Sequence, residues 1–264
     1  LCKDSGHQGD PLHHWAPDHN PHLAAMLESI DDGVQLITEK LKELGLADDT
    51  IIIFTSDNGG ETQVTSNAPL RGGKSQLYEG GIRIPMIVRW PGTIAAATVS
   101  DQHTMNTDFF PTLIKACDLK ISKNHQTDGS NMLSHWENPT EPGPGRDLHW
   151  HYPLDSPHFL GGVSSGAIRS GNWKLIEFFE TGKFELFNLE QDLGESKDVA
   201  ENYPQLVQSL SNRLQQWRLQ VGARTASGLK MSHSGSAILE DAFSEGLVSD
   251  RWFFQKYWAV KNGE

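Results

Sequence analysis

Apolar residues recur at three- and four-residue steps along residues 21–44, and this spacing predicts an amphipathic helix. The repeat consists of Leu23, Met26, Leu27, Ile30, Val34, Ile37, Leu41 and Leu44. Asn20 is a favoured N-cap residue, and Pro21 suits the first position of a helix. Asp31 and Asp32 continue the polar flank of the repeat, so we expect solvated carboxylates here rather than a metal site.

The next element is predicted by a different pattern, the continuous apolar run Ile51–Phe54. Four apolar residues without alternation predict a strand that is buried on both faces. A second strand is predicted over Ile82–Trp90, where Pro85 favours an edge or strand-start position. A helix followed by a buried strand is typical of α/β architecture.

In the second half of the chain, the pattern predicts a small antiparallel sheet covered by one helix. Residues 167–176 and 184–189 are predicted as strands, with residues 181–183 as the turn between them. Residues 204–221 predict a helix that packs across this sheet. Its apolar stripe consists of Leu206, Val207, Leu210, Leu214, Trp217 and Val221.

A change in composition lies between these two halves. A short helix is predicted over Asp108–Leu119, with Cys117 on its apolar face as a core residue. Residues 120–145 are rich in Asn, Pro, Gly and Glu, which indicates a junction between subdomains or a long surface loop. We therefore predict three regions, an α/β part over residues 1–120, the small sheet with its helix over residues 121–222, and an unassigned tail over residues 223–264.

Polar residues directly follow the predicted strand Ile51–Phe54, and Asp57 and Asn58 among them are candidate metal ligands. In open α/β sheets, ligands bind outside the carboxyl ends of the strands. A carboxylate beside an amide oxygen suits a calcium or magnesium ion. A tight turn is the alternative, because Asn-Gly is typical of hairpins. Residues 61–68 lack the alternation of a return strand, which favours the metal site.

The sequence PLRGGK at residues 69–74 predicts an anion-binding loop. Its glycine pair allows a backbone to approach a ligand closely, and Arg71 and Lys74 place a cation on each side of that pair. The spacing of a Walker phosphate-binding loop is absent. We therefore predict that Arg71 and Lys74 contact an anionic substrate.

His149 and His151 alternate with aromatic residues in the sequence LHWHYP. Rings that stack on sugar faces, together with imidazoles that form hydrogen bonds, would line a carbohydrate pocket. This makes both histidines candidate substrate-binding residues. A strand with a buried aromatic face explains the same pattern, and the two alternatives stay open at this point.

Composition narrows the classes of partner. A formal net charge of −12, without clustered Lys and Arg, argues against a nucleic-acid partner. An anionic substrate is still compatible, because salt screens a net charge beyond about 10 Å whereas a local metal ion and cations act at the site itself. No apolar run approaches the roughly 20 residues of a membrane helix. The two cysteines, Cys2 and Cys117, form neither a disulfide framework nor a zinc site.

Several of these motifs together resemble the second half of the formylglycine-dependent sulfatases, within the alkaline-phosphatase superfamily. The motifs are FTSDNGG, SNAPLRGGK, YEGGIRIP, TDFFPT and GAIRSGNWKLI, and the resemblance covers about residues 20–221. It implies that residues 1–120 are the C-terminal part of a catalytic domain, the end of an α/β/α sandwich. The small antiparallel sheet and its helix would then be a C-terminal subdomain.

The resemblance also implies an activity, the hydrolysis of aryl or carbohydrate sulfate esters. It implies that Asp57 and Asn58 hold part of a calcium site, with calcium preferred to magnesium, and that Lys74 touches the sulfate ester as a catalytic cation. The partner would be a sulfated small molecule or glycan. A periplasmic or extracellular location is expected from the family, whereas nothing indicates the oligomeric state.

One feature of that family is absent from this sequence. The formylglycine nucleophile arises from Cys or Ser in a C-x-P-x-R or S-x-P-x-R motif, and neither motif occurs in the 264 residues. Cys2 and Cys117 stand in other contexts. We therefore expect a fragment that is inactive alone, with formylglycine only in a missing N-terminal part. The alternative is a non-catalytic, sulfatase-like remnant that binds metal or a sulfated glycan.

Overall fold

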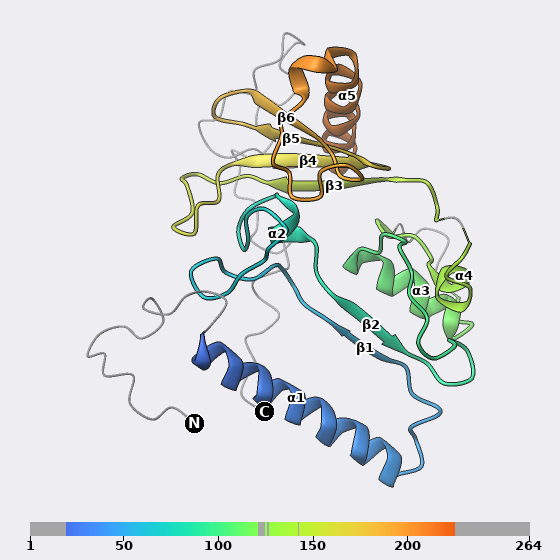
Figure 1. Ribbon diagram of the computed structural model, residues 1–264. Coiled ribbons are helices and arrows are strands. Elements are labelled where there is room, and N and C mark those ends of the chain that lie inside the picture. The colour runs from blue at the N-terminus through green and yellow to red at the C-terminus, as the bar shows by residue number, and fades with distance from the viewer. Residues whose placement is uncertain (1–19, 121–124, 126, 142, 225–264) are drawn as a thin grey trace, which may run out of the picture. The chain divides into compact units, whose positions relative to one another are not determined.

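The computed structural model describes residues 20–120, 125, 127–141 and 143–224, which are coloured in Figure 1. All of these residues belong to one compact unit of the chain. Most of the predicted tail, residues 223–264, lies outside this part, and the predicted boundary near residue 120 stays a prediction. Within the described residues, no helix combines the length and the apolar character needed to cross a membrane.

The first helix, α1 (Pro21–Glu43), confirms the prediction from the apolar repeat. The side-chain oxygen of Asn20 accepts hydrogen bonds from the backbone N–H groups of His22 and Leu23, at 3.0 and 3.2 Å, so Asn20 is the N-cap. Its Nδ2 group donates to the carbonyl oxygen of Val64 at 3.1 Å, which ties the start of α1 to the segment after the first strand. No residue of α1 is buried against the described part of the chain.

Strands β1 (Ile52–Thr55) and β2 (Met86–Arg89) form a two-stranded antiparallel sheet, with Thr55 opposite Met86. The prediction that β1 is buried on both faces is wrong for the described residues, since Phe54 is 40% exposed. A continuous apolar run is typical of a strand that packs against other elements on both faces, but no described element fully covers the side chain of Phe54.

The second predicted strand begins later than expected. The short helix α2 (Glu79–Ile82) includes Ile82, the first residue of the predicted strand, and the N–H group of Arg83 donates to the carbonyl oxygen of Glu79 at 2.7 Å. Pro85 then directly precedes β2, and this confirms its predicted strand-start position.

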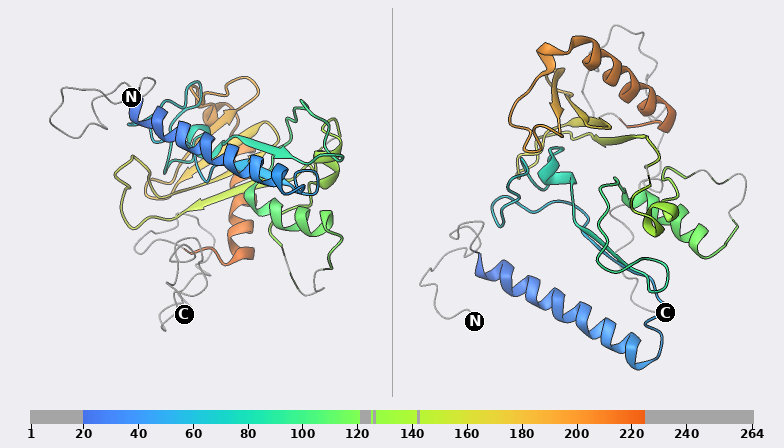
Figure 2. Two further views of the ribbon diagram at one scale, coloured as in Figure 1. Left: turned by 90° about the horizontal axis from the view of Figure 1, so that it is seen from below. Right: turned by 45° about the vertical axis from the view of Figure 1, so that its right-hand side comes forward.

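The C-terminal sheet has four antiparallel strands in the order β3-β4-β5-β6. Their bounds are β3 (Asp147–Tyr152), β4 (Ser165–Ser170), β5 (Trp173–Phe178) and β6 (Lys183–Asn188). On one face, Ile168, Leu175 and Leu186 lie in register and pack against Leu210 and Leu214 of helix α5 (Pro204–Val221). The predicted small sheet with one covering helix is therefore confirmed (Figure 1, and the right-hand view of Figure 2).

The opposite face of this sheet packs against the segment that leads into α2. Ala167, Ile176 and Phe187 form its buried centre, and the partly buried Leu77 and Tyr78 pack against them. Because both faces are covered, the middle strands alternate between two apolar cores rather than between a core and solvent. This second face is what connects the four-stranded sheet to the loops around β1.

Two sequence predictions in this region need correction. The prediction of a single strand over residues 167–176 is wrong, because this segment contains a hairpin in which Ser170 pairs with Trp173 and Gly171 adopts a positive φ of 57° at the turn. The prediction of Cys117 as a core residue is also wrong, because Cys117 caps the C-terminal end of helix α3 (Phe109–Ala116) and is exposed there.

The segment predicted as a junction or surface loop contains a helix and buried residues. Helix α4 (Leu133–Glu137) follows the fully buried Met132, whose N–H group donates to the hydroxyl of Thr112 on α3 at 2.9 Å. The remaining short elements are the 3-10 helices η3 (Asn106–Asp108) and η4 (Ala200–Asn202). The buried carboxylate of Asp108 pairs with Arg146, and this joins η3 to the start of the C-terminal sheet.

Candidate active site

Three glycine pairs bring together the two loops that carry the predicted site residues. The glycine junction, as we call it, consists of Gly59, Gly60, Gly72, Gly73, Gly80 and Gly81. The N–H group of Gly59 donates to the carbonyl oxygen of Gly81 at 2.9 Å, and that of Lys74 donates to the carbonyl oxygen of Gly60 at 3.1 Å. The backbone of Lys74 is therefore hydrogen-bonded to the loop of Asp57 and Asn58.

The spacing of this junction explains why glycine occupies its positions. A Cβ atom on Gly59 would lie 1.7 Å from the carbonyl oxygen of Gly80, and one on Gly73 would lie 2.4 Å from that of Gly60. Sequence reasoning assigned the pair at residues 72–73 to close approach of a ligand. In the structure, the space beside Gly73 is occupied by the carbonyl oxygen of Gly60 and by side-chain atoms of Asn67 and Thr62, and the space beside Gly72 by the side chains of Gln76 and Tyr78.

Asn67 fastens the glycine junction, and no pattern in the sequence singles it out. Its amide oxygen accepts a hydrogen bond from the N–H group of Gly60 at 3.0 Å. Its Nδ2 group donates to the carbonyl oxygens of Gly60 and Gly72, at 2.7 and 3.0 Å. One side chain thus holds the two loops in a fixed relation.

The predicted metal ligands, Asp57 and Asn58, follow β1 as expected. Asp57 is exposed and Asn58 is half-buried, and neither side chain has a hydrogen bond or ion pair to another described residue. The Ser56 hydroxyl orders this turn by donating to the carbonyl oxygen of Asn58 at 2.8 Å. Two uncommitted oxygens suit a calcium ion, which takes six to eight oxygen ligands, so they would supply part of its shell. Over the described ranges, no group of three His, Cys, Asp or Glu side chains could hold a metal.

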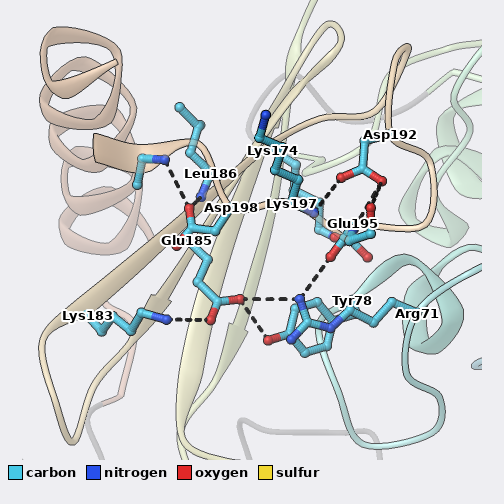
Figure 3. Close-up of polar contacts among 12 residues, drawn as sticks. Arg71, Tyr78, Lys174, Lys183, Glu185, Leu186, Asp192, Glu195, Lys197 and Asp198 are labelled. Carbon is cyan, nitrogen blue, oxygen red and sulfur yellow. Dashed lines mark hydrogen bonds and ion pairs between the residues drawn. The ribbon is translucent and has the colours of Figure 1, made fainter. Parts of the chain in front are cut away.

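The two predicted cations of the second loop have different surroundings. Lys74 is exposed, and its ammonium group has no ion pair with any described residue. Arg71 is held against the C-terminal sheet: its NH1 group donates to the carbonyl oxygen of Glu195 at 2.9 Å and lies 3.7 Å from a carboxylate oxygen of Glu185. Its guanidinium also stacks over the Tyr78 ring, 3.9 Å from the ring centre (Figure 3).

His149 and His151 lie on β3, on the face of the sheet that α5 covers. The His149 ring stacks on Trp217 of α5 at 4.8 Å between ring centres, and the His151 ring lies 5.3 Å from that of Phe179. Burial lowers the pKa of both imidazoles. These contacts correspond to the buried aromatic face, the second of the two alternatives. A contact of either histidine with a substrate stays a prediction.

A buried ion cluster fixes the glycine junction to the C-terminal sheet. The ammonium group of Lys174, which is 0% exposed, lies 3.0 Å from a carboxylate oxygen of Glu79 and 2.8 Å from one of Glu195. Arg169 pairs with Glu79 at 3.3 Å. Burial raises the pKa of Glu195, and the positive charge of Lys174 opposes this rise. Sequence reasoning missed this cluster, because the charge of a residue does not reveal that it is buried.

The loop between β3 and β4 lies beside the residues that follow Lys74. The Gln76 Nε2 group donates to the carbonyl oxygen of Leu160 at 3.4 Å. A Cβ atom on Gly162 would lie 2.1 Å from the carbonyl oxygen of Ser75, so the two backbones touch there. The same loop carries Phe159, which is 82% exposed and stacks on His158.

Two family comparisons match overlapping parts of the chain. Residues 10–119 match the sulfatase family, and residues 73–220 match the family described as N-sulphoglucosamine sulphohydrolase, C-terminal. The second match covers more than half of the 264 residues. The overlap of the two matches begins at residue 73, so it includes Lys74 at its start.

Individual relatives agree with these matches. A protein named sulfatase from Formosa agariphila is 32% identical over 236 residues, which is 82% of this chain and 42% of that protein. Arylsulfatase J of Mus musculus is 32% identical over 236 residues, with 74% of this chain and 39% of the relative covered. The chain thus spans about two fifths of the length of these curated relatives.

Solved structures show the same fold. Ps i-CgsB in complex with k-i-k-neocarrahexaose superposes with a TM-score of 0.64 at 30% identity, covering 74% of this chain and 42% of that one. A protein solved in complex with its substrate, D-glucosamine-2-N,6-O-disulfate, superposes with a TM-score of 0.62 at 25% identity, covering 74% of this chain and 39% of that one. The α/β fold with a small antiparallel sheet is therefore shared with these proteins.

Proposed function

Because this chain belongs to the sulfatase family, within the alkaline-phosphatase superfamily, we propose that it forms the C-terminal part of an enzyme that hydrolyses sulfate esters. The observation that carries this proposal is the glycine junction. It joins the exposed, unpaired Lys74 to the loop of Asp57 and Asn58 through a backbone hydrogen bond of 3.1 Å, among the residues that the structure describes. A cation and two free oxygen ligands on loops that are hydrogen-bonded to each other are suited to an anionic ester and a divalent metal ion.

The substrate class that we propose is an aryl or carbohydrate sulfate. Sulfated sugars are the better supported of the two, because one solved relative is bound to its disulfated glucosamine substrate and another to neocarrahexaose. The exposed Phe159 and its neighbour His158 lie on a loop that contacts the residues after Lys74, and an exposed ring of this kind can stack on a sugar face. We propose a periplasmic or extracellular location, as in the family.

In this proposal, each residue has a distinct chemical task. Asp57 and Asn58 would supply part of the shell of a calcium ion, which when bound would neutralise negative charge on the sulfate oxygens. Lys74 stabilises the charge that develops on the ester oxygen in the transition state. The glycine junction fixes the backbone of Lys74, and this restricts the positions that its ammonium group can reach. The formylglycine nucleophile would come from outside these 264 residues.

The test of this proposal is steady-state kinetics of the complete protein with a sulfated sugar and with a chromogenic aryl sulfate. Lys74→Ala should lower kcat by about a hundredfold or more without changing thermal unfolding, because it removes charge stabilisation alone. Lys74→Arg should restore activity only in part, since a planar fork replaces a compact charge. Lys115→Ala on α3 removes another exposed lysine and is the matched control. A Lys74→Ala enzyme with the wild-type kcat would refute the assignment.

The 264 residues alone should not hydrolyse sulfate esters, because no residue among them lies in a motif that yields formylglycine. An aryl sulfate assay with added calcium checks this, with heat-treated protein as the control. Turnover by the short chain that disappears in Lys74→Ala would show a different nucleophile. If the complete protein also lacks turnover but binds a sulfated glycan, the protein is the non-catalytic, glycan-binding remnant rather than an enzyme.

A further inference from the structure

The side chain of Arg71 contacts residues of the C-terminal sheet and its connections as well as the ring of Tyr78, which directly precedes α2. Its guanidinium donates to the carbonyl oxygen of Glu195, stacks on Tyr78 and lies 3.7 Å from the Glu185 carboxylate on β6 (Figure 3). The Tyr78 hydroxyl donates to the same carboxylate oxygen, Glu185 Oε2, at 2.8 Å. We call Arg71, Tyr78, Glu185 and Glu195 the Arg71 clamp.

Each partner in the Arg71 clamp is itself held in place. Glu195 is fully buried and pairs with Lys174, and the Tyr78 ring packs edge-on against Phe187 at 6.3 Å. Burial, and then the hydrogen bond to Glu185, raise the pKa of Tyr78, so its hydroxyl stays protonated and donates. The loop that leads to Glu195 is closed by Asp192, which accepts hydrogen bonds from the N–H groups of Ser196 and Lys197. The clamp is therefore a rigid attachment point.

The backbone of Arg71 carries this rigidity into the glycine junction. Its carbonyl oxygen accepts a hydrogen bond from the N–H group of Gly80 at 2.8 Å, and three residues later the N–H group of Lys74 is bonded to Gly60. The loop is thus fixed at both ends. Lys74 itself has a long side chain with no described partner, so the position of its ammonium group depends on where the backbone is held.

The charge of Arg71 is also compensated within the clamp. A substrate sulfate at the guanidinium would meet the negative charge of Glu185 3.7 Å from it, and it would have to compete with the bond to the carbonyl oxygen of Glu195. Lys74 has no such competitor among the described residues. From these contacts we infer that Arg71 is a positioning residue that holds the Lys74 loop on the C-terminal sheet, rather than a contact for the substrate.

The first test needs no enzymatic activity and uses this chain. Amide hydrogen exchange of Lys74 and Gly80, followed by NMR, should become about tenfold faster or more in Arg71→Ala, because a charged hydrogen bond that closes the loop is lost. Arg71→Lys should behave in the same way, since it keeps the charge but lacks the fork and the stacking. Arg213→Ala is the matched control: Arg213 is 41% exposed and ion-paired with Asp147, and Arg71 is 42% exposed. Unchanged exchange in both Arg71 variants would overturn the inference.

The second test rests on the proposed function and uses the complete enzyme. Arg71→Ala should lower kcat while KM and the inhibition constant of inorganic sulfate stay within about twofold, because ground-state binding is untouched. Glu185→Gln changes a partner of Arg71 on β6 and should also lower kcat. In the double variant, the increase in activation free energy should be smaller than the sum of the two single increases, because both changes disrupt the same contact. The opposite result would be a tenfold rise in the inhibition constant of sulfate with kcat retained. It would mean that Arg71 contributes about 1.4 kcal/mol to sulfate binding and is a substrate contact. If the complete protein has no sulfatase activity, the proposed function fails, and the exchange experiment alone decides the role of Arg71.

Discussion

Gly80→Ala adds one methyl group at the centre of the glycine junction. A Cβ atom there would lie 2.4 Å from the carbonyl oxygen of Gly72 and 2.5 Å from that of Arg71. Both neighbours are backbone atoms, so neither can turn away as a side chain would. Alanine is compatible with the helical backbone of α2, and the predicted effect is therefore steric. The backbone at Arg71 has to separate from α2, which breaks the 2.8 Å hydrogen bond between Gly80 and Arg71.

The size of this effect follows from three contributions. Overpacking costs about 1–3 kcal/mol. The lost hydrogen bond adds about 0.5–1.5 kcal/mol. Replacing a helical glycine returns roughly 0.5–1 kcal/mol through backbone entropy. The free energy of unfolding should thus fall by about 0.5–4 kcal/mol.

Urea denaturation of the 264-residue chain measures this change, and Gly33→Ala provides the matched control. Gly33 lies within α1, and apart from the adjacent backbone of the helix itself no described atom lies within 4 Å of the position that a methyl group would take there, so this variant should gain about 0.5–1 kcal/mol. The reasoning would be refuted if Gly80→Ala unfolded at the wild-type urea concentration while Gly33→Ala was stabilised. The backbone contacts at the junction would then be loose enough to accept a methyl group.

Two further predictions concern calcium and pH. Asp57→Ala should weaken calcium binding by the complete protein more than Asn58→Ala does, because it removes a charge together with a ligand. Calorimetry measures both affinities. Unchanged calcium binding in both variants would mean that these residues form only a tight turn. Burial holds the pKa of His149 below its ordinary value of 6.5, so the unfolded chain binds more protons below that pH and stability should fall as the pH drops. His149→Phe keeps a ring on Trp217 but cannot titrate, so its melting temperature should depend less on pH between about pH 7.5 and 5.5; an identical dependence would contradict this.

The elements that can be predicted well from the sequence are those set by short-range rules. Helix α1 begins at Pro21 after the N-cap Asn20, and α5 has the predicted bounds Pro204–Val221 with Gly222 in the left-handed conformation at its end. Caps and apolar periodicity involve residues within a turn or two of each other, so one chain segment contains the whole signal. The hairpin at Gly171 escapes prediction for a different reason. Its Gly-Asn signal is present, but the apolar residues on either side resemble one continuous run.

The surroundings of β1 are harder to predict, because they depend on residues far away in the sequence. A glycine pair shows that a side chain does not fit, but it does not show what fills the space. At residue 72 the space is filled by the side chains of Gln76 and Tyr78, and at residue 73 by the carbonyl oxygen of Gly60 together with side-chain atoms of Asn67 and Thr62. The fixing residue Asn67 acts through its amide at the same junction, and a lone Asn in a polar loop is too common to be predicted as such.

The two cations of the loop at residues 69–74 have different partners, and the local sequence does not predict this difference. Arg71 and Lys74 flank the same glycine pair, so their local sequence predicts the same role for both. Their partners differ: Glu185 and Glu195, more than a hundred residues away, engage Arg71 and leave Lys74 unpaired among the described residues. A planar guanidinium suits several fixed contacts at once, whereas a compact ammonium on a flexible stem suits a ligand that comes and goes. The different roles of the two cations therefore follow from residue type once the distant contacts of Arg71, the Glu185 carboxylate and the Glu195 carbonyl oxygen, are known.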